Sequence, residues 1–322
     1  MEQEKKNIYE VLEDDIMNSD LSESEKNARL SRLIQVRSKQ VNIMLVGATG
    51  SGKSSTINAM FDMNVAKVGV GVDPETNSIT KYELDNLIIW DSPGLGDGVK
   101  RDKEITRDII KKLNELGADG KPIIDLVLVI MDSSSKDLGT TYELINKVLV
   151  PCLGDEAGKR IIIGLNQADI AMKGKHWDRE ENKPDEVLSA FLKKKAASVK
   201  DRIKDGTGLD LEPIIYCAGY SEEGEEQCKP YNLNKLLYNI VQIVPREKRL
   251  VLVDNINTNK ENWEHDDEED DYKEDIVDVI FDYIASGSDI GGKLLGVPGK
   301  LLGGVAGAIC GTVAGIVKSI FG

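Results

Sequence analysis

Residues 41–56 read VNIMLVGATGSGKSST, a short apolar run that breaks into a glycine-rich turn and ends in Lys-Ser. The turn, residues 47–54, fits the pattern G-x-x-x-x-G-K-[ST], which is typical of a loop that holds the phosphates of a nucleotide. The context agrees, because Val41 to Val46 predicts a buried strand and Ser54 to Phe61 the start of a helix. We therefore predict a strand–loop–helix unit that binds phosphate, and we call residues 47–54 the phosphate loop.

The residue types of the phosphate loop explain how it would bind. Its glycines let the backbone turn successive N–H groups inward at the positive end of a helix, where they attract anions. Lys53 is expected to reach the β- and γ-phosphates, and the Ser54 hydroxyl to hold Mg²⁺. The predicted binding residues of this loop are Gly47, Thr49, Gly50, Ser51, Gly52, Lys53, Ser54 and Ser55.

Composition limits the partners and the compartment. A net charge of -15 and a pI near 4.8 argue against a general affinity for DNA, RNA or anionic lipid, since these need a basic surface. The four cysteines show no CxxC pairing and the two histidines lie far apart in the sequence, so neither a disulfide framework nor a zinc site is indicated. We expect a reducing cytoplasm, and the charged first ten residues predict no secretory signal.

Hydrophobic periodicity divides the chain into four parts. Residues 1–40 predict two amphipathic helices, and residues 41–245 alternate strand-like and helix-like runs. This alternation is typical of an α/β domain with a mostly parallel six-stranded sheet and helices on both faces. Residues 246–275 predict an acidic linker, and residues 276–322 a helical, glycine-rich C-terminal tail. The predicted strands are 41–46, 79–84, 87–90, 123–131, 160–165 and 213–217, and the predicted helices of this domain are 102–116, 137–150, 185–204 and 232–243.

A second phosphate-site motif, Asp91-Ser92-Pro93-Gly94, follows a predicted strand. An Asp in this place can hold Mg²⁺, usually through water, and the Gly94 N–H can sense the γ-phosphate. Between the two motifs, Phe61–Thr80 lacks helical periodicity, and this chemistry requires a threonine from such a loop, which we call the switch loop, at the metal; Thr76 is the candidate and Thr80 the alternative. The predicted catalytic residues are Lys53, Thr76 and Gly94, and the predicted metal ligands are Ser54, Thr76 and Asp91.

Recognition of the nucleotide base is expected from residues 166–169, Asn-Gln-Ala-Asp, which we call the base loop. The Asp169 carboxylate can accept two hydrogen bonds from guanine, a pairing that adenine cannot supply. Asn166 is expected to tie this loop to the phosphate loop. The Ala218 N–H, after the last predicted strand, is assigned to the guanine carbonyl.

The order GATGSGKS, PET, DSPG, NQAD and CAG resembles the Ras-like, translation-factor-class GTPases. It is most similar to the small bacterial GTPases related to Era and, more distantly, to septins. INAMF, DSPGLGDG and NQAD, followed by an insertion with HWD, resemble the bacterial family labelled ribosome-binding-GTPase-like. The resemblance covers roughly residues 30–245 and implies GTP and GDP as ligands, Mg²⁺ as cofactor and slow hydrolysis.

The chain departs from this family in three ways. Gln167 replaces the lysine of N-K-x-D, which removes packing area from the guanine. Leu95 stands where Ras-type GTPases carry the glutamine that orients the attacking water, so hydrolysis should be slow unless the phosphate, another loop residue or a second copy across the nucleotide face supplies the missing group. Nothing after residue 245 resembles the RNA-binding KH module of Era, which weighs against a ribosome partner.

The last 60 residues change character twice. Residues 261–275, the acidic segment, hold ten acids and one lysine and predict an extended spacer. Residues 287–322 hold 11 of the chain's 30 glycines, and between Lys300 and Lys318 glycines recur every four residues at 303, 307, 311 and 315. Small residues at this spacing favour close helix contact, although the run of ~26 Å is short for a relaxed membrane span. Membrane contact and packing against protein both stay open.

These patterns predict a GTP-binding and GTP-hydrolysing switch whose nucleotide state controls the glycine-rich tail. It would be cytoplasmic, or held at the inner face of the membrane through residues 287–322. The alternative is a soluble GTPase that acts through dimerisation or a ribosome-assembly partner, with a tail that is only structural.

Overall fold

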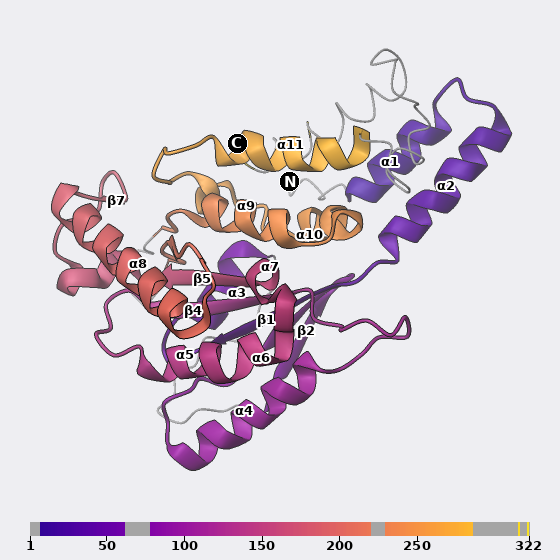
Figure 1. Ribbon diagram of the computed structural model, residues 1–322. Helices are drawn as coiled ribbons and strands as arrows, with labels where there is room; N and C mark the ends of the chain where they lie inside the picture. Colours follow the sequence, from indigo (N-terminus) through magenta and orange to yellow (C-terminus); the bar gives the residue numbers. More distant parts are fainter. Residues whose placement is uncertain (1–6, 62–77, 220–228, 286–314, 316–320, 322) are drawn as a thin grey trace.

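The computed structural model describes residues 7–61, 78–219, 229–285, 315 and 321 (Figure 1). Its centre is a six-stranded sheet in the order β2-β3-β1-β4-β5-β8. All neighbouring strands pair in parallel except β2, which runs antiparallel to β3 at one edge. The strands are β1 (Val41–Gly47), β2 (Thr80–Leu84), β3 (Leu87–Asp91), β4 (Leu126–Asp132), β5 (Ile161–Asn166) and β8 (Ile214–Ile215). The predicted sheet is confirmed, with shorter strands at 126–132 and 214–215 than the sequence indicates.

Helices cover both faces of the sheet because its strands carry apolar side chains on both sides. In β4, Leu126, Leu128 and Ile130 belong to one core and the alternate residues Val127 and Val129 to the other. The first core is covered by α1 (Ile8–Met17), α2 (Glu23–Arg37), α3 (Lys53–Met60), α9 (Leu233–Ile243), α10 (Arg249–Asp254) and α11 (Tyr272–Ala285). The second is covered by α4 (Val99–Leu113), α5 (Gly139–Leu144), a π-helical turn (Ile145–Leu149), α6 (Val150–Leu153), α7 (Ala157–Arg160) and α8 (Glu186–Thr207). Figure 1 shows α9, α10 and α11 stacked on one side of the sheet and α4 to α6 on the other.

The two N-terminal helices form as the sequence predicts. Ser22 and Glu25 make the capping box, with Glu25 N–H donating to Ser22 Oγ at 3.4 Å and Ser22 N–H to Glu25 Oε2 at 3.0 Å. The start of α1 is fixed by a buried hydrogen bond of 2.8 Å from Ile8 N–H to Asp254 Oδ1 on α10. The N-terminal helices are therefore bound to the C-terminal part of the chain.

The acidic segment differs from its prediction as an extended spacer. Lys235 on α9 donates to Asp267 at 2.6 Å and to Glu269 at 2.8 Å, and Lys193 on α8 reaches Glu269 at 3.1 Å. Trp263 within the segment is fully buried. Lysine partners on neighbouring helices offset the repulsion between the acidic side chains. The Trp263 ring adds an apolar contact, which the acidic composition of the segment did not indicate. The segment is packed against the domain.

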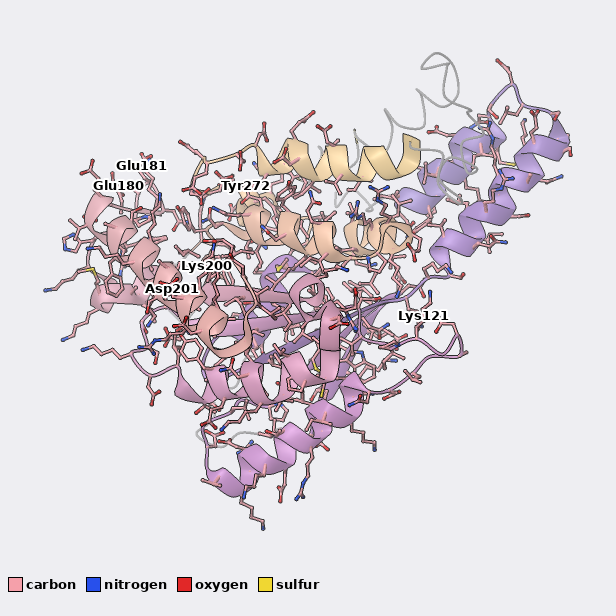
Figure 2. The ribbon with its side chains drawn as sticks, in the orientation of Figure 1. Lys121, Glu180, Glu181, Lys200, Asp201 and Tyr272 are labelled. Carbon is pink, nitrogen blue, oxygen red and sulfur yellow. The ribbon has the colours of Figure 1, made fainter. Side chains whose placement is uncertain are left out.

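The last residues of the acidic segment begin α11, which packs on α9. Three residues of α11 are buried in the first core, which α3 also covers: Ile276, Val277 and Ile280. Tyr272 begins the helix and lies on the same side of the molecule as Glu180 and Glu181, whereas Lys121 lies on the opposite side of the view (Figure 2). The chain from residue 246 to residue 280 thus contributes to the core on this face of the sheet.

Most of the glycine-rich tail lies outside the described residues, including Gly303, Gly307 and Gly311. Gly315 is exposed, and Phe321 is buried with 4% of its surface accessible. Among the described residues, no helix is both long and apolar enough to cross a membrane.

Candidate functional site

The phosphate loop connects β1 to α3 and lies at the carboxyl edge of the sheet, as the sequence predicts. Two glycines are required by its geometry. Gly52 has φ 87°, and a Cβ there would lie 2.2 Å from Asn166 Nδ2; at Gly47 a Cβ would lie 2.2 Å from Ile130 O. The loop is therefore pressed between β4 and the base loop. The first N–H groups of α3 have no partner within the helix and remain available for an anion at this edge.

Lys53, the first residue of α3, bends back over the phosphate loop. Its Nζ donates to Gly47 O at 3.3 Å and to Ala48 O at 3.1 Å, and the side chain is almost fully buried. Burial lowers the pKa of Lys53, and the nearby carboxylates of Asp91 and Asp97 act against this shift. The ammonium group is thus held at the loop where phosphate charge would stabilise it.

Ser54 and Asp91 face each other at the start of α3 and the end of β3. Ser54 Oγ donates to Asp91 Oδ2 at 3.5 Å, and Asp91 Oδ1 is buried without a hydrogen-bond partner in the described part of the chain. Burial raises the pKa of Asp91 to about 6, against the opposing effects of Lys53 and Ser54. A hydroxyl and a carboxylate with an unsatisfied oxygen fit the hard oxygen donors that Mg²⁺ prefers.

Of the two threonines considered as metal ligands, only Thr80 lies among the described residues. Thr76, the predicted ligand, lies outside the described residues, so its role stays a prediction. Thr80 begins β2 and pairs in register with Asp91 of β3. Its backbone therefore lies in the sheet, next to the strand that ends in the Asp91 carboxylate.

The segment after Asp91 contacts the phosphate loop directly. Leu95 N–H donates to Gly47 O at 3.2 Å, and Thr49 N–H donates to Leu95 O at 3.0 Å, so the two segments pair like short parallel strands. Gly94 fits only because it has no side chain, since a Cβ there would lie 2.3 Å from Thr49 Oγ1. The Leu95 side chain is buried in the second core. The sequence did not indicate this pairing, because it joins residues more than 40 positions apart.

The base loop is held against the phosphate loop by two amide side chains. Asn166 Nδ2 donates to Ser51 O at 3.0 Å, which is the link that the sequence predicts. Gln167, which has φ 62°, donates from Nε2 to Gly50 O at 2.8 Å, so the residue that replaces the usual lysine makes a second link. Sequence reasoning missed this link because it considered only the contact of residue 167 with the base.

Of the two residues predicted to contact guanine, Asp169 and Ala218, the second makes a different hydrogen bond from the one predicted. Cys217 Sγ donates to Asp169 Oδ1 at 2.9 Å, which fixes the carboxylate at the end of the base loop. The Ala218 N–H, assigned to the guanine carbonyl, donates instead to Asn166 Oδ1 at 3.0 Å. Ala218 thus orients Asn166 in this structure. Its contact with the base stays a prediction.

Comparison with known proteins agrees with this geometry. None of the curated proteins compared with the chain matches it. Residues 41–198, which contain the phosphate loop, the DSPG motif and the base loop, match the AIG1 family. These residues form a P-loop GTPase domain of the AIG1 family type. The predicted P-loop GTPase domain is confirmed.

Solved structures similar to the GTPase domain have low sequence identity. Toc33 from Arabidopsis thaliana, in complex with GDP and Mg²⁺, is 14% identical with a TM-score of 0.44, over 76% of this chain and 98% of that chain. The bacterial dynamin GTPase LeoA from ETEC is 15% identical with a TM-score of 0.40, over 99% of this chain and 49% of that chain. Aquifex aeolicus Era bound to GDP·AlF₄⁻ is 14% identical with a TM-score of 0.38, over 64% and 57% of the two chains.

Behind its phosphate loop, the GTPase domain has a buried polar contact that the sequence did not indicate. Thr56 Oγ1 on α3 and the Tyr216 hydroxyl lie 2.8 Å apart, and Tyr216 is fully buried. Burial raises the pKa of Tyr216, so the phenol stays neutral. This contact joins α3 to the residue that follows β8.

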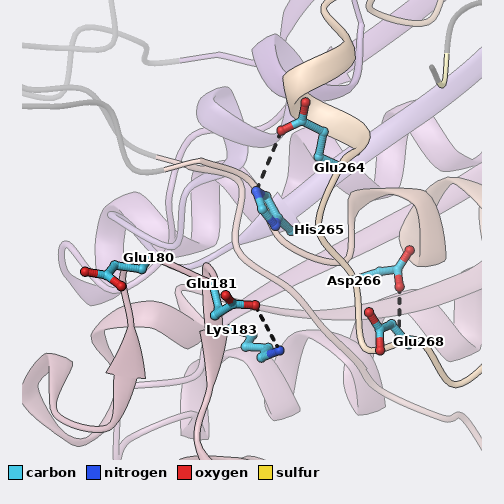
Figure 3. A pocket seen from close by; sticks show the side chains of 7 residues that line it. All are labelled: Glu180, Glu181, Lys183, Glu264, His265, Asp266 and Glu268. Carbon is cyan, nitrogen blue, oxygen red and sulfur yellow. Dashed lines mark hydrogen bonds and ion pairs between the residues drawn. The ribbon is translucent and has the colours of Figure 1, made fainter.

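The structure also has an acidic pocket of about 290 Å³, apart from the phosphate loop (Figure 3). It lies between the hairpin of β6 (Trp177–Asp178) and β7 (Lys183–Pro184) and the acidic segment. Its lining residues are Glu180, Glu181, Lys183, Glu264, His265, Asp266 and Glu268. Part of this charge is paired, since Lys183 Nζ lies 3.3 Å from Glu181. The His265 ring lies beside Glu264, with Nε2 3.8 Å from its carboxylate. Among the described residues, no group of three or more His, Cys, Asp or Glu side chains is arranged to hold a metal ion.

Proposed function

We propose that this protein binds GTP and GDP with Mg²⁺ at the phosphate loop and hydrolyses GTP, so that it acts as a nucleotide switch. The observation that carries the proposal is the position of Asn166. It is bonded to the phosphate loop through Ser51 and stands three residues before Asp169, so a base held by Asp169 and phosphates held by the loop belong to one ligand.

The predicted phosphate, metal and base residues have separate roles in this proposal. The N–H groups of residues 49–55 and the Lys53 ammonium bind phosphate oxygens, and Asp169 accepts hydrogen bonds from the guanine. Ser54 holds Mg²⁺ directly and Asp91 through water, with Thr76 as the expected third group. Bound Mg²⁺ would neutralise charge on the phosphate oxygens. Gly94 lies against Thr49, where its N–H can reach a third phosphate after the segment moves.

Hydrolysis is expected to be slow in the isolated chain. Leu95 takes the position of the water-orienting glutamine, and its side chain is apolar and buried. An apolar side chain cannot orient water, so the missing group must come from the phosphate itself, from another loop residue or from a second copy across the nucleotide face. Among proteins with similar solved structures, dimerisation is important for the GTPase activity of the chloroplast translocon components Toc33 and psToc159.

The effector part of the switch is the C-terminal region. Residues 246–285 pack on the same core as α3, which supports a physical link between the nucleotide and the tail. The second candidate is a GTPase that acts through a dimer or a ribosome-assembly partner, with the tail only structural. Membrane contact through residues 287–322 belongs to the first candidate.

Binding of a fluorescent GDP analogue to the purified chain tests the proposal. Lys53→Ala and Ser54→Asn should each lower the affinity at least tenfold in the presence of Mg²⁺, since both remove a group that contacts phosphate or metal. Lys147→Ala is the matched control, because Lys147 is exposed on the π-helical turn, where it pairs with Glu143. Unchanged binding in both site variants would overturn the proposal.

A further inference from the structure

The C-terminal end of α3 is completed by residues from the far end of the chain. The last carbonyl groups of a helix have no partner within it. In α3, Asn58 O accepts from Asn257 Nδ2 at 3.0 Å and Ala59 O from Asn262 Nδ2 at 2.9 Å. Met60 O accepts from the Asn257 N–H at 2.9 Å. We call these three hydrogen bonds the asparagine clamp.

The chain leaves α3 through the same contact. Phe61 pairs with Ile256 as an antiparallel bridge. The sequence predicts that the switch loop, which would carry Thr76 to the metal, starts at Phe61. Phe61, where that predicted loop starts, is therefore joined to the residue before Asn257 of the asparagine clamp.

Trp263 connects the asparagine clamp to the end of the tail. It is fully buried, and its Nε1 donates to Asn257 O at 2.8 Å. The Phe321 ring packs edge-on against it, with ring centroids 5.5 Å apart and planes at 89°. Lys273 Nζ on α11 donates to Phe321 O at 3.3 Å. Phe321 thus has an aromatic contact and a polar contact at one site.

We propose that Trp263 and Lys273 form a docking site for Phe321 of the same chain, and that docking is coupled to the bound nucleotide through the asparagine clamp. The coupling rests on the proposed nucleotide binding at the phosphate loop. The eight residues of α3 form one rigid element, with the phosphate site at its first residue and the asparagine clamp at its last turn.

The structure also indicates the direction of the coupling. In this structure Phe321 packs on Trp263 while the Thr49 N–H donates its hydrogen bond to Leu95 O. A third phosphate needs N–H groups of this loop, so GTP favours a different arrangement from the one that holds Phe321. A ligand shifts such an equilibrium only by its different affinity for the two states, and the effect is reciprocal. GTP therefore releases Phe321, and loss of Phe321 favours GTP.

The test uses the full chain labelled with 5-fluorotryptophan, which gives one ¹⁹F signal for each of the three tryptophans. Trp263→Phe identifies the signal of Trp263. We expect this signal to differ between GDP and a non-hydrolysable GTP analogue. In Phe321→Ala it should take the position of the GTP state with either nucleotide. Phe191→Ala is the control, since Phe191 is 39% exposed on α8.

Nucleotide affinities measured on the same samples complete the test. Phe321→Ala should raise the affinity for the GTP analogue relative to GDP by about fivefold or more, the lower range of known coupling. Asn262→Ala should bind both nucleotides while reducing this coupling. Nucleotide binding with an unchanged Trp263 signal, and a ratio within twofold of the original, would overturn the docking proposal alone. Absence of any nucleotide binding would overturn the proposed function as well.

Discussion

Thr49 Oγ1 donates a hydrogen bond of 3.0 Å to Asp97 Oδ2, across 48 positions between the phosphate loop and the segment after DSPG. The carboxylate also lies 3.6 Å from Arg101 on α4, and it contributes to the field at Lys53. Asp97 thus brings a negative charge to the place where a third phosphate would bring another. In the nucleotide switch that we propose, this contact favours GDP over GTP.

Asp97→Asn should therefore raise the affinity for a GTP analogue relative to GDP, by roughly threefold to tenfold, because it removes a like charge near the γ-phosphate. Titration calorimetry with both nucleotides measures the ratio. Glu104→Gln, a change of equal charge at an exposed site on α4, should leave it unchanged. A ratio that responds equally to both variants would show that net charge alone matters.

The buried carboxylate of Asp91 gives a pH dependence without metal. Its pKa is about 6 in the folded protein and 3.8 in the unfolded chain, so the folded state binds the proton more tightly between these values. The cost of burying the charge is therefore present above pH 6 and is lost as the pH falls through the folded pKa. In EDTA, Asp91→Asn should be more stable at pH 7.5 by roughly 1–3 kcal/mol, and the difference should shrink towards pH 4.5.

Thermal denaturation at both pH values measures this difference. Asp205→Asn, on the exposed side of α8, is the control and should show no such pH dependence. With Mg²⁺ present, nucleotide binding should weaken below pH 6 as the Asp91 carboxylate takes up its proton. Equal stability of the Asp91 variant and the original protein at pH 7.5 would mean that the carboxylate is solvated.

Cys217 is expected to position Asp169 for guanine. Cys217→Ala should lower GDP affinity about threefold to tenfold, because the carboxylate loses a hydrogen bond, whereas Cys217→Ser keeps a donor and should bind normally. Cys152→Ala, at the half-buried cysteine of α6, is the control. Loss of affinity in the serine variant as well would point to packing rather than hydrogen bonding.

Leu95→Gln should not create an efficient hydrolase, although it restores the residue type of Ras-like switches. Leu95 is buried in the second core, so an amide there loses its water contacts. We expect a loss of roughly 1–3 kcal/mol of stability and no more than a twofold change in single-turnover hydrolysis. A large rate increase would show that residue 95 leaves the core when GTP binds.

The boundary predicted at residue 245 can be tested by truncation. A chain that ends at residue 245 loses Ile256, Trp263 and Ile276 from the core that α3 also uses, so we expect it to aggregate or melt at a much lower temperature. A chain that ends at residue 285 keeps these residues and should fold. Equal melting temperatures would support a separate domain that ends at residue 245.

Local sequence patterns were sufficient to predict the phosphate loop, because the G-x-x-x-x-G-K-S motif depends only on the strand before it and the helix after it. The capping box of α2 and the alternation of strands and helices are local in the same sense. The contacts that complete the site are not: Thr49 with Asp97, Gln167 with Gly50, and Asn262 with Ala59 all join distant positions. No spacing rule indicates such pairs. The acidic segment was misjudged for the same reason, since its partner Lys235 lies on α9.

The asparagine clamp also sets an order of events during synthesis. Its hydrogen bonds join positions 199 and 203 residues apart, so α3 leaves the ribosome long before the residues that cap it. At about 5–20 residues per second, this delay is on the order of 10–40 seconds. Throughout that time the nascent chain carries a phosphate loop whose helix lacks its partners. We expect nucleotide capture to be a late event in translation, after most of the polypeptide has emerged.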